Sequence, residues 1–434
     1  MPALNQISLP SQTVPPRRTQ SILLVTTCWW PSIARLAHLL TLADCRVSVL
    51  CPPGHPARIV PGVAVFEQAA LRPMHALSGA IAIARPDLIV PADDRATAHL
   101  HRLHRTGSDA ERRLVAHSLG SPHGYATVMS RIRLLALARR LGIAVPEGTR
   151  IGSVADLSRW LARVPGPWVL KVDATWGGTG VRLAGTPQQA HAALRQLRRR
   201  LDIRGALKRL LVNRDPFRFA DGLRRGASEV SAQAHVSGRP GNLAMFCWEG
   251  EVLAATVAET VACWGDTGPS TIVRLVDRPE LLAGARRLTR ELRLTGFYGL
   301  DFMVEETTGQ ALLIELNPRP TSLSNIRLEA GRDLIGAVAT ALSGKACPPP
   351  SRMPKGDLVA HFPLAWQWNR NDARLTAAFQ DAPWDEPTLL AEMLKPSWPE
   401  RLWLARLASG LRRTLRRWRS GRVRFGSAPL DARS

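Results

Sequence analysis

Two carboxylates and one amide stand where their oxygen atoms can converge. Asp301 lies in the apolar segment 299–304, and Glu315 and Asn317 close the apolar segment 311–317. The two segments read as the strands of a hairpin, and side chains two residues apart in a strand point to the same face. Glu315 and Asn317 therefore share a face that Asp301 reaches from the neighbouring strand.

These oxygen atoms suit a magnesium ion, which takes one or two carboxylates in proteins and completes its shell with phosphates and water. An E-x-N triplet by itself is more often a solvent-facing part of a sheet. Here the triplet ends an apolar strand and precedes a proline-flanked arginine, Arg319, and acceptor groups beside apolar neighbours need a counter-charge. The pattern favours a metal site, with Arg319 as the candidate cation for a transferred phosphoryl group because a guanidinium binds phosphate bidentately.

A second segment combines a lysine with a glycine-rich loop. Lys171 lies in the apolar strand 168–172, and Gly177, Gly178 and Gly180 follow it. Small residues let backbone N–H groups close over phosphates, and a lysine ammonium adds a point charge. Such a loop alone is more often a simple hairpin, but a lysine in an apolar strand needs an anion. The two features together indicate a phosphate-binding site.

The N-terminal part must supply a scaffold for these segments. Apolar, β-branched runs at 22–25, 47–50 and 86–91 alternate with a helical pattern at 34–42, which predicts a doubly wound unit with a parallel sheet. Residues 92–94 carry two aspartates directly after a strand, at the sheet edge where open α/β folds bind ligands.

Composition shifts divide the rest of the chain. A helix is expected over 127–141, and alternating strands and helices extend from 168 to about 342, where a triple proline follows. We predict four parts, namely a disordered leader over 1–19, a Rossmann-like domain over 20–118, an α+β body over 119–345 and a C-terminal extension over 346–434.

The order of these pieces resembles the ATP-grasp superfamily, and the nearest similarity is to bacterial carbamoyl-phosphate-synthase-like and biotin-carboxylase-like members without an assigned substrate. The resemblance implies an ATP-grasp fold of mixed α/β and α+β character, in which ATP lies between two subdomains. It assigns the strand lysine, the phosphate loop, the magnesium ligands and the arginine near the transferred phosphoryl group to Lys171, Gly177, Gly178, Gly180, Asp301, Glu315, Asn317 and Arg319.

The resemblance also suggests contacts for the rest of the nucleotide. The hinge corresponds to 233–238, where the main chain at Ala234 and Val236 would bond the adenine edge. Two positions depart from the family pattern. Arg131 stands where many members have a lysine, and the hinge lacks the usual glutamate, which leaves Asn242 as a candidate for the ribose.

The implied activity is a ligase that uses ATP with Mg²⁺ or Mn²⁺ to activate a small-molecule carboxylate as an acyl phosphate. An amine or another nucleophile then attacks, giving ADP and phosphate. Family analogy also suggests a homodimer. The alternative is a catalytically silent nucleotide-binding scaffold that binds an anionic membrane or nucleic acid through a basic tail.

That tail is the chain's most basic segment. Residues 401–424 hold nine arginines and no acid, with apolar residues at helical spacing. A basic amphipathic helix can lie on an anionic membrane, or it can pack its apolar stripe on the enzyme body. The overall charge of +23 attracts polyanions in general, and a proteome-wide preference for arginine would produce the same excess.

Other sequence features narrow the class of protein. No pattern of a sequence-specific nucleic-acid reader occurs, and the six cysteines form no C-x-x-C pair. The N-terminus lacks a secretory signal and no apolar run has the length of a membrane span. We therefore predict a cytoplasmic protein, with the tail as its candidate link to the inner membrane face.

Overall fold

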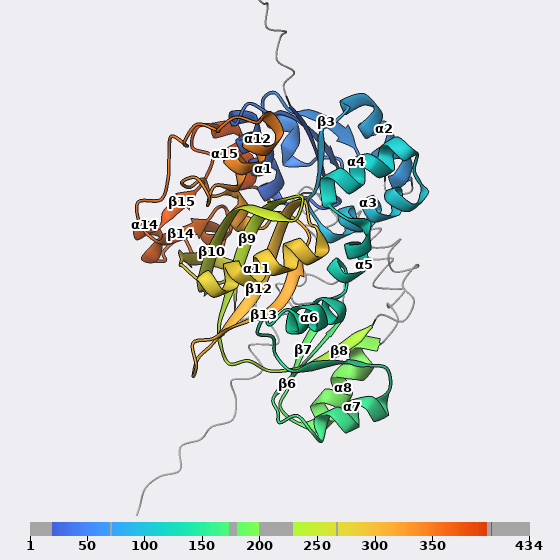
Figure 1. Ribbon diagram of the computed structural model, residues 1–434. Helices are drawn as coiled ribbons and strands as arrows, with labels where there is room; N and C mark the ends of the chain where they lie inside the picture. Colours follow the sequence, from blue (N-terminus) through green and yellow to red (C-terminus); the bar gives the residue numbers. More distant parts are fainter. Residues whose placement is uncertain are drawn as a thin grey trace, which may run out of the picture.

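Three β-sheets organise the part of the chain that the structure describes (Figure 1). The computed structural model describes residues 20–69, 72–172, 180–198, 229–265, 268–396 and 401. The predicted leader, Gly177, Gly178 and the basic tail beyond Arg401 lie outside the described residues.

The first sheet is parallel throughout, as predicted, in the order β3-β2-β1-β4. Its strands are rich in Val, Ile and Leu, and β1, β2 and β4 are buried almost throughout, as expected for a parallel sheet with both faces covered. Its elements are β1 (Ser21–Val25), α1 (Pro31–Leu42), β2 (Arg46–Cys51), η1 (Pro56–Ile59), β3 (Ala64–Glu67), α2 (Pro73–Ala84), β4 (Leu88–Pro91), α3 (Asp94–Thr106) and α4 (Asp109–Leu119).

The helix predicted over 127–141 is interrupted. After η2 (Pro122–Gly124), a short α5 (Tyr125–Val128) ends before α6 (Arg131–Arg140) begins. The hydroxyl of Ser130 accepts a hydrogen bond from the Arg133 N–H and caps the new helix. The prediction of one continuous helix was therefore wrong, and the break places Arg131 at the first position of α6.

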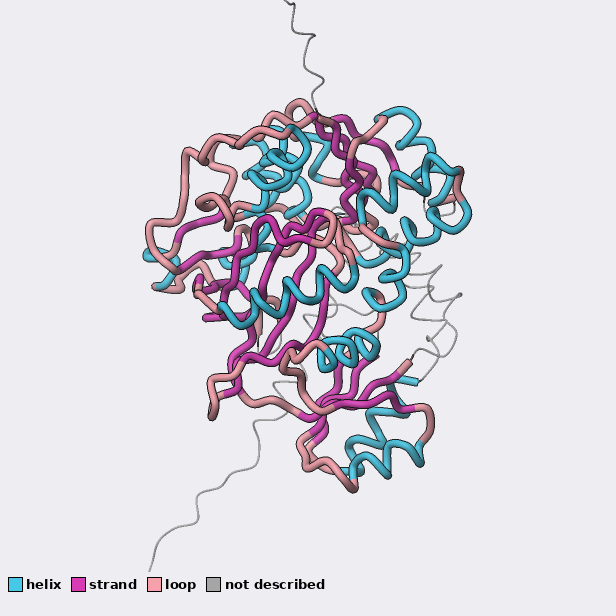
Figure 2. The backbone as a smooth tube through the Cα atoms, in the orientation of Figure 1, coloured by secondary structure: helices cyan, strands magenta, loops and turns pink. Residues whose placement is uncertain are grey.

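A small antiparallel sheet follows, in the order β5-β8-β6-β7. It lies below α6 in Figure 2, apart from the strands of the larger sheet. Its buried apolar residues form a cluster of their own with the two helices that follow β5 and β7. The elements are β5 (Gly148–Ile151), α7 (Val154–Leu161), β6 (Trp168–Val172), β7 (Val181–Ala184), α8 (Pro187–Arg198) and β8 (Val230–Ala234).

The largest sheet has the order β13-β12-β9-β10-β11-β14-β15 and is antiparallel except for the pair β14 and β15. Its elements are β9 (Gly238–Trp248), β10 (Glu251–Cys263), β11 (Ser270–Leu275), α11 (Pro279–Leu292), β12 (Gly296–Glu305), β13 (Ala311–Asn317), η3 (Ser322–Asn325), α12 (Leu334–Ser343), β14 (Leu358–His361), α13 (Leu364–Trp368), α14 (Arg374–Ala377), β15 (Phe379–Asp381) and α15 (Pro387–Met393).

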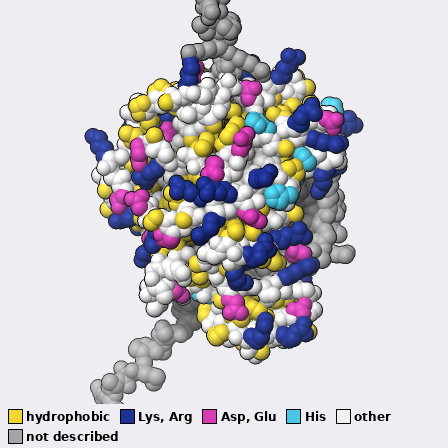
Figure 3. All heavy atoms as spheres, in the orientation of Figure 1, with side chains coloured by type: hydrophobic (Ala, Val, Ile, Leu, Met, Phe, Trp, Pro, Cys, Tyr) yellow, Lys and Arg dark blue, Asp and Glu magenta, His cyan; other side chains and the backbone are white. Residues whose placement is uncertain are grey.

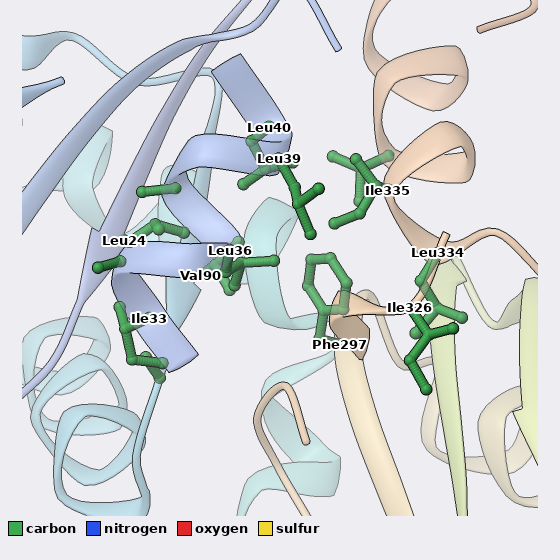
Figure 4. Close-up of a cluster of buried hydrophobic side chains, with 14 of the residues drawn as sticks. Leu24, Ile33, Leu36, Leu39, Leu40, Val90, Phe297, Ile326, Leu334 and Ile335 are labelled. Atoms are coloured by element: carbon green, nitrogen blue, oxygen red, sulfur yellow. The ribbon is translucent and has the colours of Figure 1, made fainter. Parts of the chain in front are cut away.

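Successive side chains along β12 point to opposite faces of the sheet and pack into two different hydrophobic clusters. Phe297 faces the cluster that includes α1 and α12, whereas Tyr298 faces the cluster that includes α6 and α11. The first cluster also takes Leu24 and Val90 from the parallel sheet, and in Figure 4 these residues lie beside α1 while Phe297 lies between α1 and α12. The N-terminal sheet and the large sheet therefore share one hydrophobic core.

The surface is basic in a dispersed way. Figure 3 shows Lys and Arg side chains over the whole visible face, with Asp and Glu between them. Among the helices that the structure describes, none is long and apolar enough to cross a membrane.

Candidate functional site

The β12–β13 hairpin brings the three predicted metal ligands together. In its register Asp301 stands opposite Glu315, and Gly299 stands opposite Asn317. The Asn317 Nδ2 atom donates to Asp301 Oδ2 at 2.9 Å. Because the neighbouring strand β9 pairs with β12 on its other side, this oxygen-rich patch lies on the penultimate strand and the edge strand of the sheet.

A residue of β9 completes the patch. Asn242 pairs in register with Asp301, and its Nδ2 donates to Asp301 Oδ1 at 2.7 Å. Thr321 Oγ1 in turn donates to Asn242 Oδ1 at 2.9 Å. Asn242, the candidate for the ribose contact, lies against Asp301 and orients its carboxylate. Its role as a neighbour of the candidate ligands was missed, because only the strand order reveals it.

Arg131 holds the other carboxylate. Its Nη2 lies 2.7 Å from Glu315 Oε1, and the side chains are 5% and 34% exposed. The helix break at Ser130 makes this contact, because it turns the first residue of α6 toward β13. A small cavity beside Glu315 is lined by Arg131, Asp94 and Pro318 among others.

Arg319 is fixed from three directions. Its Nε donates to Asp94 Oδ1 at 3.1 Å, its Nη2 donates to Asn317 Oδ1 at 3.1 Å, and its guanidinium lies 5.2 Å from the centroid of the Trp30 ring. Thr97 Oγ1 also donates to the Pro318 carbonyl at 3.0 Å. The start of α3, the helix that follows strand β4 of the parallel sheet, therefore positions Arg319.

Asp94 titrates in an unusual setting. Burial raises the pKa of its carboxyl, the nearby Glu315 and Asp93 add to that rise, and the Arg319 charge opposes it. The Asp93 carboxylate beside it caps α3 by accepting from Ala96 N–H and also accepts from Thr27 N–H. Both aspartates were expected at a ligand-binding sheet edge, whereas the contact of Asp94 with Arg319 was not predicted.

The remaining candidate residues lie on the small sheet. Lys171 on β6 is only 8% exposed, and the Val172 N–H donates to the Gly180 carbonyl at 3.0 Å beside it. The Ala234 N–H donates to the Glu147 carbonyl at 2.8 Å, so this N–H is already bonded within the protein, and Val236 follows the end of β8. These residues form a second group, distinct from the hairpin.

Helix α6 contacts both β13 and β5, and so links the hairpin to the small sheet. In Figure 1 it lies between them. The helix therefore carries Arg131, which contacts Glu315 of the hairpin, and it also packs against the small sheet, on which Lys171 lies.

The chemistry of the hairpin fits a magnesium ion. Its candidate ligand atoms are all oxygens, two carboxylates and one amide. Each carboxylate accepts hydrogen bonds from amide or guanidinium groups, and those donors mark the positions where a cation would be favourable. Across the described ranges, no group of three or more His, Cys, Asp and Glu residues could hold a metal ion; a site with two carboxylates leaves the remaining positions to phosphates and water.

Comparisons with known proteins bear on the fold. Residues 218–323 match the family model of an ATP-grasp domain. No curated protein matches the sequence. Among solved structures, the chain is similar to N5-carboxyaminoimidazole synthetase from Staphylococcus aureus complexed with ADP, at 12% identity and a TM-score of 0.54, with 76% of this chain and 79% of that chain covered.

Two further structures extend the comparison. The biotin carboxylase domain dimer of Hydrogenobacter thermophilus 2-oxoglutarate carboxylase, in complex with MgADP, ADP and bicarbonate, matches at 11% identity and a TM-score of 0.54, covering 78% of this chain and 72% of that chain. An L-amino acid ligase from Bacillus licheniformis matches at 12% identity and a TM-score of 0.51, covering 75% of each. These likenesses show a shared fold, and together with the match over residues 218–323 they show that the chain contains an ATP-grasp domain.

Proposed function

We propose that this protein is a Mg-ATP-dependent ligase that activates a small-molecule carboxylate for attack by an amine or another nucleophile. The observation that carries the proposal is the convergence of Asp301, Glu315 and Asn317 with two arginines from different parts of the chain. A scaffold that only binds nucleotide has no need for both a metal-ligand set and paired phosphate cations.

The proposed reaction transfers a phosphoryl group. An oxygen of the substrate carboxylate forms a bond to the γ-phosphorus as the bond to the ADP oxygen breaks, and the nucleophile then displaces phosphate from the acyl carbon. A magnesium ion held by Asp301, Glu315 and Asn317 would neutralise phosphate charge when bound; Mn²⁺ offers the same chemistry.

The chain's own residues would mainly position and screen charge. Arg131 at the start of α6 would bind a phosphate, and Arg319 would face the transferred group. Asp94 is a positioning residue, because it holds the Arg319 guanidinium in place. Lys171 and the loop that ends at Gly180 would hold the phosphates from the small sheet, and the main chain at Ala234 and Val236 would meet the adenine.

Two similar proteins support this choice. One solved structure contains MgADP, and another is an L-amino acid ligase. A carboxylate and an amine are accordingly the substrate classes that we propose. This proposal keeps the predicted domain limits at 118 and 345. It also keeps the homodimer and a cytoplasmic location with the tail at the inner membrane face. Sedimentation of the full-length chain with anionic vesicles at low salt tests the membrane contact, and failure to pellet would contradict it.

The first test measures thermal stabilisation by a non-hydrolysable ATP analogue with and without Mg²⁺. A ligand that binds only the native state raises stability by mass action, by about 2.7 kcal/mol at a hundred times its Kd. We expect a magnesium-dependent shift in the wild type that Glu315→Gln loses. ADP release during a screen of carboxylates with amines then tests turnover. No shift in the wild type would contradict the nucleotide site, and a shift without any turnover would favour the silent scaffold.

A further inference from the structure

A second cavity lies away from the hairpin, where α1, the end of η3, the segment 347–352 and β15 meet. Its volume is about 280 Å³. None of its lining residues lines the small cavity beside Glu315. Its charged and amide side chains are three arginines, one asparagine and two aspartates, namely Arg35, Arg327, Arg352, Asn325, Asp381 and Asp385.

Arg35 has donors without an acceptor. Its Nε lies 3.7 Å from Asp381 Oδ1, which is longer than a hydrogen bond. Within the described part of the chain, the Nε and Nη1 atoms of Arg35 are buried and make no hydrogen bond. The side chains of Arg35 and Asp381 are only 11% and 5% exposed. Because unpaired buried donors are costly, and more so when they are charged, an anionic group that came within reach of this guanidinium would be stabilised.

Asn325, in contrast to Arg35, has an acceptor without a donor. Its Nδ2 donates to the Ser32 carbonyl at 3.4 Å, which fixes the orientation of the amide. Among the described atoms, its buried Oδ1 accepts no hydrogen bond. The Asp381 carboxylate lines the same cavity, and burial raises its pKa to about 6 while Arg35 opposes the rise. An amide oxygen and a poorly solvated carboxylate are both acceptors for a donor group.

The other polar lining residues already have partners. Arg327 Nε donates to both oxygens of Asp333 at 2.9 and 2.8 Å. Asp385 Oδ2 lies 2.8 Å from His38 Nε2. The guanidinium of Arg352 lies 5.9 Å from the centroid of the Trp384 ring and is exposed at the rim. The unmet hydrogen-bonding capacity is therefore concentrated at Arg35 and Asn325.

The volume sets the size of an occupant. At about 30 Å³ for each water molecule, the cavity has room for roughly nine waters, or a compound of a similar number of heavy atoms. An occupant must be small and must carry an anionic acceptor together with a hydrogen-bond donor. A free α-amino acid has both groups on one carbon.

We propose that this cavity binds a free α-amino acid, with its carboxylate on Arg35 and its ammonium group on Asn325 and Asp381. Arg352 at the rim adds a second cation near the carboxylate. The site is separate from the proposed ATP site, and the proposal does not depend on the ligase activity.

The test is calorimetric titration of the full-length protein with each L-α-amino acid in the absence of nucleotide. For each amino acid that binds, the des-amino carboxylate of the same chain length and inorganic phosphate are titrated as well. We expect binding of at least one amino acid, with both comparison compounds at least ten-fold weaker. Loss of one charge-assisted hydrogen bond weakens binding roughly ten- to hundred-fold, and we expect this for Arg35→Gln.

Two further variants guard against misfolding. Arg35→Gln/Asp381→Asn removes both buried charges together, and Arg352→Ala changes only an exposed side chain; both should weaken the same amino acid. Arg159→Ala on α7, whose side chain is 71% exposed, is the matched control and should bind like the wild type. Retained stabilisation by Mg²⁺ and the ATP analogue would show that a variant is folded.

Three results would overturn the proposal. In the first, the wild type binds no amino acid. In the second, all of the cavity variants bind the amino acid as tightly as the wild type does. In the third, the des-amino compound or phosphate binds as tightly as the amino acid. The proposed function fails separately, because Glu315→Gln should lose the magnesium-dependent shift and keep amino-acid binding. An amino acid that bound only as a ligase substrate beside Glu315 would leave the Arg35 variants unaffected.

Discussion

Replacing Arg131 by Met separates the two jobs that the structure gives this arginine. In the absence of ligands its guanidinium occupies Glu315 Oε1 at 2.7 Å, an oxygen that a metal ion would need. In the nucleotide complex the same cation would face a phosphate. Met keeps the apolar stem of the side chain and removes the charge. We therefore expect opposite effects on the two ligands, with tighter binding of a divalent cation alone and weaker binding of the ATP analogue.

The magnitude follows from the contact. A hydrogen bond to a charged group contributes about 1.5–3 kcal/mol net. Since Glu315 is 34% exposed and solvent screens its charge, we take about 1–2 kcal/mol. At about 1.4 kcal/mol for each factor of ten, the Kd for Mn²⁺ without nucleotide should fall roughly five- to thirty-fold. The Kd for the ATP analogue should rise by a similar factor.

Titration calorimetry with Mn²⁺ alone, and then with the analogue, measures both constants. Arg133→Met is the matched control, because Arg133 is an exposed arginine on the same helix. The control should change neither constant. If Arg131→Met left Mn²⁺ binding unchanged or weakened it, Glu315 would not be a metal ligand that Arg131 shields.

Three further predictions concern stability. Asp94→Asn should lower the free energy of unfolding in urea by about 1–2 kcal/mol, because the Arg319 guanidinium loses a partly buried partner. The control is Asp109→Asn, which changes a side chain that is 81% exposed and should have no effect. Equal losses of stability in the two variants would contradict the reasoning. The folded-state pKa of Asp381, about 6, lies above its unfolded value, so this group's contribution to stability should fall by about 3 kcal/mol as the pH rises from about 4 to 6. Urea unfolding across that range should show this loss in the wild type relative to Asp381→Asn, and parallel pH profiles would refute it. Gly299→Ala should lower the free energy of unfolding by about 1–3 kcal/mol, since a Cβ at that position would lie 2.4 Å from Thr321 Cγ2. Gly309→Ala is the comparison variant, because a Cβ there meets nothing within 4 Å while the backbone has a φ of +68°. Its loss of stability therefore measures the effect of the backbone conformation without a steric clash.

The hairpin could be predicted because its signal is local. Alternation fixes which residues of one strand share a face, and a short connection fixes the register of the next strand, so Asp301, Glu315 and Asn317 were expected together. The parallel N-terminal sheet was predictable for a similar reason, since its strands are continuous apolar runs bounded by turns.

The surroundings of the site depend on contacts that no local pattern contains. Asp94 and Arg319 are 225 positions apart, and Arg131 and Glu315 are 184 positions apart. The interruption at Ser130 was missed because the apolar spacing continues through it, and a single capping serine is a weak signal beside that pattern. The contact of Asn242 with Asp301 could not be predicted, because β9 becomes a neighbour of β12 only in the folded sheet.

The separate cores have a consequence for hydrogen exchange. The parallel sheet and the large sheet share buried side chains, so their amides should exchange only when both open together. The described part of the small sheet has a cluster with no member from either of the other sheets. Its amides should therefore exchange through a lower-energy local opening. Lys171 lies in that less protected unit, whereas Asp301 and Glu315 lie in the more protected one, so bound nucleotide would slow exchange most strongly in the small sheet.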